Sequence, residues 1–202
     1  MSLLVSRKAP NFTSTVVMPD GKIEDNYQYY QKVSKYSVLF FYPLDFTFVC
    51  PSELISLSQN IDEFTNRNVD VLAISIDSQF SHAAWRNTPI QQGGIGSVNF
   101  TMVADTSHEI CRIYGVEHFE ANVALRATFI VDQDKVVRAQ FVNDLPLGRN
   151  IGEILRTIDS LQHFEANGEV CPMNWEKGAK AMNPDAEGVK SWLVEKYPEQ
   201  QA

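Results

Sequence analysis

The sequence predicts an α/β fold in which a mixed β-sheet lies between helices and is followed by an irregular C-terminal arm. Two short apolar runs separated by a segment of helical periodicity indicate a βαβ unit. A later pair of β-rich runs joined by polar residues indicates an antiparallel hairpin, which makes the sheet mixed. Periodicity weakens after residue 167. We therefore expect one domain over residues 1–167 and an arm over residues 168–202.

The βαβ unit is predicted from residues 36–76. The run YSVLFFY at residues 36–42 is almost wholly apolar and is closed by Pro43, which is typical of a central strand buried on both faces. A second apolar run covers residues 69–76. The segment between them predicts one helix that begins near Cys50, because apolar side chains recur there at three- and four-residue steps: Leu54, Leu57, Ile61 and Phe64.

The hairpin and a closing helix come next. Residues 127–131 and 136–142 are rich in β-formers and flank the turn-forming residues DQDK. Asn150 is a suitable N-cap for a helix whose apolar positions fit the helical period: Ile151, Ile154, Leu155, Ile158 and Leu161. The arm that follows is rich in Pro and Gly and predicts only a short helical segment near residues 189–195.

Composition excludes several classes of function. The net charge of −8, with no local cluster of Lys and Arg, disfavours binding to nucleic acid or anionic lipid. No stretch approaches the ~20 apolar residues of a membrane span, and the start MSLLVSRKAP does not resemble a secretion signal. The three widely spaced cysteines do not form the framework of a disulfide-rich secreted protein. We therefore expect the protein to reside in the reducing cytoplasm.

One tripeptide recurs: Val-Cys-Pro stands at residues 49–51 and again at 170–172. Pro51 favours the first position of a helix, so the sulfur of Cys50 is expected at a helix N-terminus, where free amides and the helix dipole stabilise a thiolate. Keeping a cysteine largely as thiolate at neutral pH takes roughly 3.4 kcal/mol relative to an ordinary thiol, and a helix terminus supplies at best ~2. A cation must therefore help, and Arg126 is the candidate.

A nucleophilic thiolate beside hydrogen-bond donors is suited to attack on a peroxide. Faster attack requires donors that stabilise the charge developing on the leaving oxygen, and Thr47 and Arg126 are the candidates. Pro43 would shape the loop and exclude water. The product is a sulfenic acid, with which a second thiol can condense to a disulfide. Cys171, in the irregular arm, is the expected partner.

Each of these residue types also has a common structural role. A lone cysteine is most often buried and structural, as we expect for Cys111, and an arginine that begins a strand is most often solvated. The four histidines show no spacing for a metal site with the cysteines, and the glycines of residues 93–96 lack the Lys-Ser/Thr of a phosphate loop. We expect neither a metal nor a cofactor. A thioredoxin-type disulfide exchanger is disfavoured because no Cys-x-x-Cys is present.

The segment PLDFTFVC resembles the peroxiredoxin signature, with Pro43, Thr47 and Cys50 at its fixed spacing. The resemblance extends over nearly the whole chain, through KAPNF, CPSE, HAAWRNTP, GGIG, LRATF, DLPLGR and VCPMNW. The chain resembles a typical two-cysteine peroxiredoxin of the alkyl hydroperoxide reductase C type. This resemblance implies a thioredoxin-like fold, in which Glu53 and Arg149 support the active-site arginine.

The resemblance also implies a catalytic cycle and an assembly. Cys50 would be the peroxidatic cysteine, and Cys171 would resolve it across a homodimer interface. Dimers would form rings, commonly decamers, and a thioredoxin-like or flavoprotein disulfide reductase would recycle the enzyme. An alternative function in the same family is that of a redox-regulated chaperone or peroxide-signalling partner.

Overall fold

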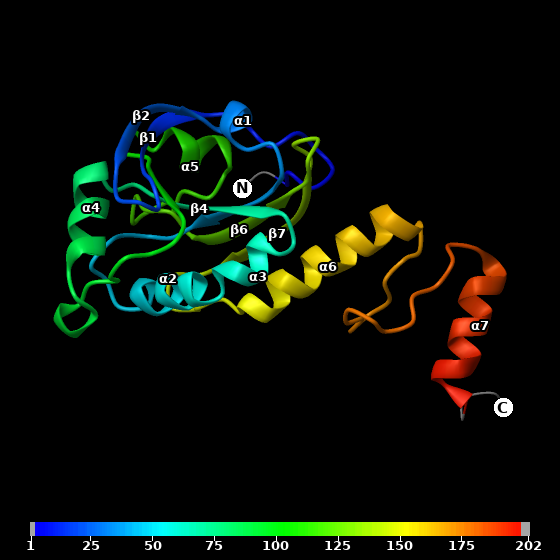
Figure 1. Ribbon diagram of the computed structural model, residues 1–202. Helices are drawn as coiled ribbons and strands as arrows, with labels where there is room; N and C mark the ends of the chain where they lie inside the picture. The colour runs from blue at the N-terminus through cyan, green and yellow to red at the C-terminus, as the bar shows by residue number, and fades with distance from the viewer. Residues whose placement is uncertain (1–2, 199–202) are drawn as a thin grey trace. The chain divides into compact units, whose positions relative to one another are not determined.

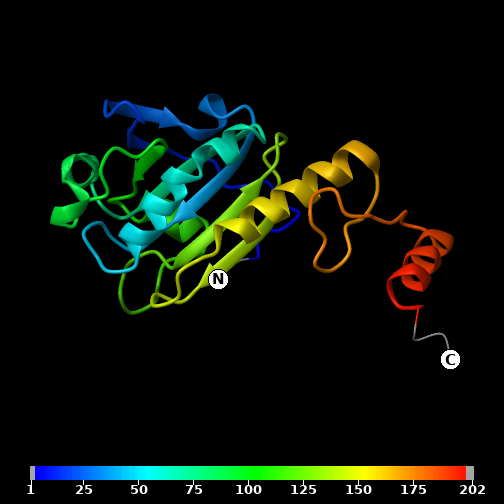
Figure 2. The same cartoon turned by 60° about the horizontal axis from the view of Figure 1, so that its bottom comes forward.

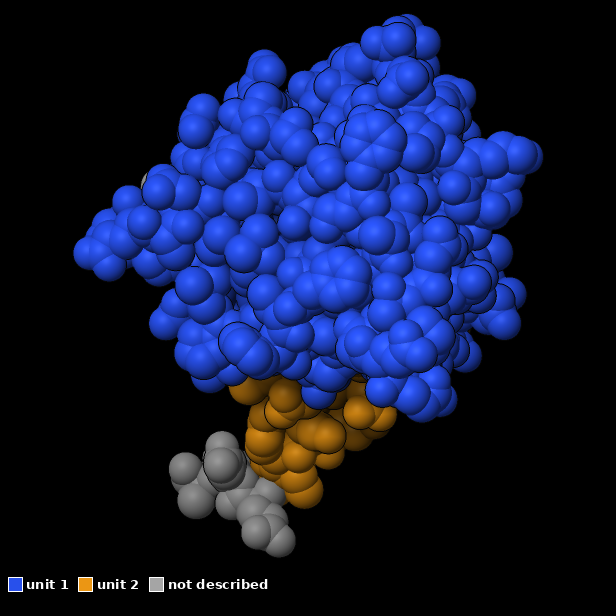
Figure 3. All heavy atoms as spheres, turned by 90° about the vertical axis from the view of Figure 1, so that its left-hand side faces the viewer, with its two compact units in different colours: residues 1–151 blue, residues 152–202 orange. Residues whose placement is uncertain are grey.

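A computed structural model describes residues 3–198 and divides the chain into two compact units. Unit 1 covers Met1–Ile151 and unit 2 covers Gly152–Ala202, as coloured in Figure 3. Unit 1 contains the whole sheet, and unit 2 contains most of helix α6 (Ile151–Asn167) together with the C-terminal segment. The domain boundary predicted from the sequence lies after residue 167, at the end of α6, whereas the two compact units divide after Ile151. The predicted boundary stays a prediction.

Unit 1 is built on a single seven-stranded sheet in the order β2-β1-β5-β4-β3-β6-β7. The pairs β3–β4 and β4–β5 are parallel and the other pairs are antiparallel, which confirms the predicted mixed sheet. The strands are β1 (Thr13–Val17), β2 (Ile23–Gln28), β3 (Tyr36–Phe41), β4 (Val69–Ser75), β5 (Thr101–Ala104), β6 (Arg126–Val131) and β7 (Val137–Asn143).

Helices cover both faces of this sheet. Figures 1 and 2 show α2 and α3 on one face and α1 and α5 on the other. The helices of unit 1 are α1 (Tyr29–Lys32), α2 (Cys50–Gln59), α3 (Ile61–Thr65), α4 (Gln79–Asn87) and α5 (Glu109–Ile113), with a 3₁₀ turn, η1 (Ile90–Gln92), after α4. None of the helices in residues 3–198 is both long and apolar enough to cross a membrane.

The central strand β3 is buried along its whole length, as its apolar sequence predicts. Its alternate side chains Leu39 and Phe41 point into the core that α1 and α5 cover. There the ring of Phe41 lies 5.2 Å from that of Tyr114 and 5.7 Å from that of Phe129, at tilted and edge-on angles that aromatic pairs favour. This packing fixes the end of β3 from which the loop to Cys50 departs.

The single helix predicted from Cys50 to Phe64 is wrong, because the structure contains two helices separated at Asn60. Asn60 has φ −103° and ψ 13°, which is not helical, and its side-chain Nδ2 donates to the carbonyl of Ser56 at 2.8 Å. Asparagine competes in this way with the helix backbone for hydrogen bonds, so it tends to end helices. The apolar period continues across the break, which is why sequence periodicity alone misses it.

The predicted hairpin and closing helix are confirmed. Strands β6 and β7 pair antiparallel, and α6 begins at Ile151, directly after Asn150. The short helix predicted at residues 189–195 is helix α7, which extends over Ala186–Lys196. It begins earlier than predicted because the Asp185 carboxylate caps it, accepting from the N–H of Gly188 at 2.7 Å.

Candidate active site

Cys50 is the first residue of α2 and follows the loop of residues 43–49. Its side chain is fully buried, and Pro51 occupies the first turn, where the missing N–H costs no hydrogen bond. The preceding residue, Val49, provides no side-chain cap. The sulfur therefore lies beside the positive end of a helix of ten residues, as the sequence predicts.

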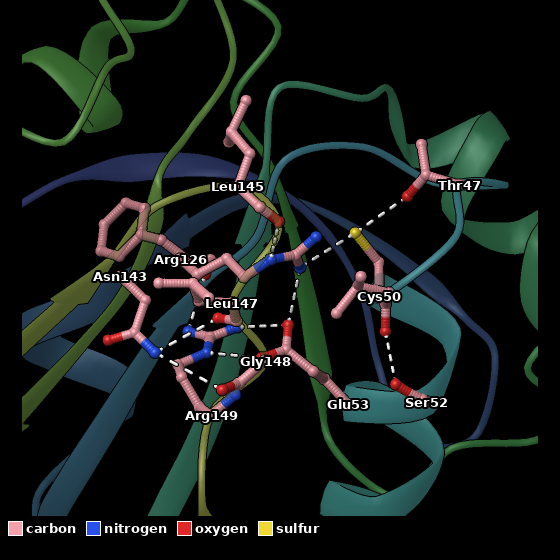
Figure 4. A network of polar contacts seen from close by, with 12 residues as sticks. Thr47, Cys50, Ser52, Glu53, Arg126, Asn143, Leu145, Leu147, Gly148 and Arg149 are labelled. Atoms are coloured by element: carbon pink, nitrogen blue, oxygen red, sulfur yellow. Dashed lines mark hydrogen bonds and ion pairs between the residues drawn. The ribbon is translucent and has the colours of Figure 1, made fainter.

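Two donors converge on this sulfur from different elements (Figure 4). The Thr47 hydroxyl lies 2.9 Å from Cys50 Sγ, and Arg126 Nη1 lies 3.4 Å from it. Thr47 Oγ1 is also 2.9 Å from the carbonyl of Leu44, so its single hydrogen can serve either acceptor. Both side chains therefore direct a hydrogen-bond donor at the sulfur.

Arg126 is held in a fixed orientation at the start of β6. Its side chain is only 4% exposed, unlike most arginines that begin a strand. Nε donates to the carbonyl of Leu145 at 2.6 Å, and Nη1 donates to Glu53 Oε2 at 2.8 Å. Because the guanidinium contacts Leu145, Glu53 and Cys50, it cannot turn away from Cys50 without losing buried hydrogen bonds.

Glu53 joins the two buried arginines of the site. Arg149 donates to Glu53 Oε1 from its backbone N and its Nε, each at 2.9 Å, and to Oε2 from Nη2 at 2.9 Å. Burial would raise the pKa of Glu53, but hydrogen bonds and charge from Arg149, with the charge of Arg126, hold that pKa below its ordinary value. Two guanidinium charges and one carboxylate leave a net positive charge beside the sulfur of Cys50.

Arg149 is itself anchored to the sheet. Its Nη1 donates to the carbonyls of Phe41 and Ala127, each at 2.8 Å, and its guanidinium lies 3.3 Å from the centre of the Phe40 ring. Burial lowers the pKa of Arg149, which the hydrogen bonds and charge of Glu53 oppose. The site is thus anchored on β3 and β6, which are antiparallel neighbours within the sheet.

The loop before Cys50 is partly strained and partly exposed. Pro43 is buried directly after β3, and Phe46 has a φ of 53°, a left-handed conformation that is uncommon for a bulky residue. The side chain of Phe48 is 98% exposed. The expected role of Pro43, to shape the loop and exclude water, stays a prediction.

Cys171 lies in unit 2, in the segment after α6. Its thiol is half-buried, with Sγ 3.6 Å from the carbonyl of Ser160, and the flanking Val170 pairs with Met182. Burial raises the pKa of the Cys171 thiol, which the bond to Ser160 and the charge of Arg156 oppose. The pairing of Cys171 with Cys50 stays a prediction.

The third cysteine, Cys111, is fully buried in α5 within the core cluster. Burial, followed by the nearby charge of Asp105, raises the pKa of its thiol far above the ordinary range. Such a thiol is unreactive at neutral pH, in line with the packing role expected for it. Within residues 3–198 no group of His, Cys, Asp and Glu side chains is arranged to hold a metal ion.

Sequence reasoning missed a polar cluster directly behind the loop. Asp45, two residues before Thr47, accepts hydrogen bonds from the hydroxyls of Tyr42 and Ser81, and its Oδ2 lies 2.8 Å from His82 Nδ1. An Asp in a loop and a His in a helix carry no spacing signal, so only the folded chain brings them together.

Comparisons with known proteins agree with this geometry. The model of the AhpC/TSA family matches residues 5–140, and that of the C-terminal domain of 1-Cys peroxiredoxin matches residues 160–199. Alkyl hydroperoxide reductase C of Buchnera aphidicola subsp. Schizaphis graminum is 49% identical, covering 94% of this chain and 96% of its own. Thioredoxin peroxidase of Echinococcus granulosus is 43% identical, covering 96% of this chain and 99% of its own.

A solved structure shares the fold closely. The reduced 2-Cys peroxiredoxin of Plasmodium vivax superposes with a TM-score of 0.92 at 43% sequence identity, over 96% of this chain and 100% of that chain. This match establishes the thioredoxin-like fold of the peroxiredoxins. The chain therefore belongs to the AhpC/TSA family and is a thiol peroxidase of the peroxiredoxin class.

Proposed function

We propose that the protein reduces hydrogen peroxide and organic hydroperoxides, with Cys50 as the sulfur that is oxidised. The observation that carries this proposal is the convergence of the Thr47 hydroxyl and the Arg126 guanidinium on a buried sulfur at the start of α2. A site with net positive charge suits a thiolate nucleophile, and a similar protein is named alkyl hydroperoxide reductase C.

The first step is a two-electron oxidation of the sulfur. The Cys50 thiolate attacks one peroxide oxygen, an S–O bond forms as the O–O bond breaks, and the leaving oxygen takes up a proton to become an alcohol or water. Negative charge develops on that leaving oxygen in the transition state. Arg126 and Thr47 are positioned to stabilise it, because both already direct donors to the place where peroxide must approach the sulfur.

The second step forms a disulfide. The thiolate of Cys171 from a partner subunit attacks the sulfur of the Cys50 sulfenic acid; an S–S bond forms as the S–O bond breaks, and the leaving hydroxide takes up a proton to become water. Cys50 is fully buried, so this step requires the start of α2 to open locally. A thioredoxin-like or flavoprotein disulfide reductase then returns both thiols, as the name of the similar thioredoxin peroxidase suggests.

The assembly proposed with this cycle is a homodimer, further arranged as a decameric ring. Strand β7 ends the sheet in the part of the chain that the structure describes. The N-terminal segment pairs with its first residue, because Ser6 N donates to the carbonyl of Val137 at 2.8 Å and Val137 N donates to that of Arg7 at 2.9 Å, so the part of its outer edge beyond Val137 is the part available to another strand. We place the protein in the cytoplasm, because a cycle that passes through free thiols needs a reducing compartment.

A reductase-coupled assay with hydrogen peroxide tests the proposed function. Cys50→Ser should abolish turnover. Cys171→Ser should permit one oxidation per chain but prevent the intermolecular disulfide on a non-reducing gel, and Cys111→Ser should leave both unchanged. Sustained turnover by Cys50→Ser would refute the proposal.

A further inference from the structure

The Thr47 hydroxyl is carried by a tight turn over residues 44–47. The turn is closed where Thr47 Oγ1 reaches the carbonyl of Leu44, and the same oxygen lies 2.9 Å from Cys50 Sγ. Asp45 and Phe46 are the two central residues of this turn, and Phe46 has a φ of 53°. A turn with a strained central residue keeps its shape only if its surroundings hold it. The direction of the Thr47 hydroxyl therefore depends on what holds Asp45 and Phe46.

Helix α4 holds both central residues. His82 Nδ1 lies 2.8 Å from Asp45 Oδ2, and the ring of Phe46 lies 5.7 Å from that of Trp85. His82 and Trp85 are three residues apart, so they occupy the same face of the helix, and both are fully buried. Within residues 3–198, the polar contacts of these two side chains are with groups other than the sulfur, and both side chains contact the turn behind it.

The His82–Asp45 pair has further hydrogen-bond partners on other elements. His82 Nε2 faces the carbonyl of Val103 at 3.2 Å. The Asp45 carboxyl accepts from the Tyr42 hydroxyl at 2.7 Å and from Ser81 Oγ at 2.8 Å. The contact between His82 Nδ1 and Asp45 Oδ2 is therefore a buried hydrogen bond within a connected polar network.

We propose that this buried His82–Asp45 hydrogen bond is a positioning device that directs the Thr47 hydroxyl at the sulfur of Cys50. The bond anchors the turn to α4, and its loss would leave a buried polar group without its partner. The inference rests on the proposed function, because it assigns a role in the oxidation of Cys50. It also gives His82 a function where the sequence predicted only a structural histidine.

The test measures the second-order rate of oxidation by hydrogen peroxide with rapid mixing, in full-length protein carrying Cys171→Ser so that only the first step is seen. Asp45→Asn and His82→Gln should each lower this rate by about tenfold or more, the effect of losing a buried hydrogen bond. The control is His108→Gln, since His108 forms a bond of 2.7 Å with Glu117 away from the loop. Its rate should stay within about twofold of the parent.

A double-mutant cycle separates positioning from a general structural effect. If the His82–Asp45 hydrogen bond acts through the Thr47 hydroxyl, His82→Gln should change the rate by no more than about twofold when Thr47 is already Val, because the two substitutions remove the same interaction. A full tenfold loss in the Thr47→Val protein would overturn the proposal. So would unchanged oxidation rates in both Asp45→Asn and His82→Gln.

A milder variant keeps the test decisive if circular dichroism shows that Asp45→Asn or His82→Gln does not fold. Tyr42→Phe removes one donor to Asp45 and should lower the oxidation rate about threefold, again only while Thr47 is present. A parental rate in Tyr42→Phe would then overturn the proposal. Failure of the proposed function looks different, because the parent itself would then show no fast oxidation beyond that of Cys50→Ser.

Discussion

Arg149 binds both carboxylate oxygens of Glu53, with its Nε 2.9 Å from Oε1 and its Nη2 2.9 Å from Oε2. The same carboxylate accepts from Arg126, so one acidic side chain aligns the guanidinium that faces Cys50. A bidentate pair of this kind defines position as well as charge. Glu53 thereby connects the stability of the sheet to the chemistry of the sulfur.

Replacing Glu53 by Gln should destabilise the protein by about 3–5 kcal/mol, because two buried guanidinium charges lose their counter-charge. The pKa of Glu53 is lowered from 4.5 in the folded state, so its stabilising contribution is complete above pH 4.5 and is lost as the pH falls through the lowered value. Urea unfolding should therefore be measured at several pH values. The difference in the free energy of unfolding between parent and variant should become smaller only at acid pH.

Exposed Glu63 provides the control for this prediction. It forms an ion pair with Arg67 and its side chain is 54% exposed, so Glu63→Gln should cost less than about 1 kcal/mol. A Glu53→Gln protein as stable as the parent at neutral pH would contradict the assigned role of Glu53.

Replacing Arg126 by Met should slow the oxidation of Cys50 by about 10- to 150-fold, since a hydrogen bond to a charged group contributes about 1.5–3 kcal/mol. Arg126→Lys keeps the positive charge but loses the planar guanidinium, which also donates to Glu53 and to the carbonyl of Leu145. Its oxidation rate should therefore lie between those of the parent and of Arg126→Met. Rapid mixing with hydrogen peroxide measures the rate, with exposed Arg112→Met as the control. Equal rates in the Met and Lys variants would show that charge at this position is irrelevant.

Disulfide formation should accelerate with pH. Burial raises the pKa of the Cys171 thiol above 9.0, so near neutral pH its reactive thiolate is scarce and increases by about tenfold per pH unit. The second kinetic phase after mixing with peroxide should follow this dependence up to the raised pKa. A second phase independent of pH would indicate that Cys171 thiolate is not the attacking group, or that local opening limits the rate.

The sequence predicted the parts of the fold that have a periodic signal. Strand β3, the hairpin of β6 and β7, and helix α6 follow from the spacing of apolar residues, and the position of Cys50 at a helix start follows from Pro51. The break at Asn60 was missed because the apolar period runs through it. A single polar residue can end a helix without disturbing that period.

The candidate site was predictable only where a motif or an energy requirement pointed to a residue. The need for a cation beside the sulfur singled out Arg126, and the structure places its Nη1 3.4 Å from Cys50 Sγ. The pairing of His82 with Asp45 was not predictable, because the two residues are 37 positions apart and each is a residue type common on surfaces. Such contacts exist only after α4 packs against the loop.

The most direct test of the account is the rate at which hydrogen peroxide oxidises Cys50 in protein where Cys111 and Cys171 are both Ser. Because the site directs the donors of Thr47 and Arg126 at the reacting atoms, the second-order rate constant should exceed that of free glutathione by about 10³-fold or more. A rate constant within about tenfold of glutathione would contradict the account, since the donors would then contribute little to transition-state stabilisation.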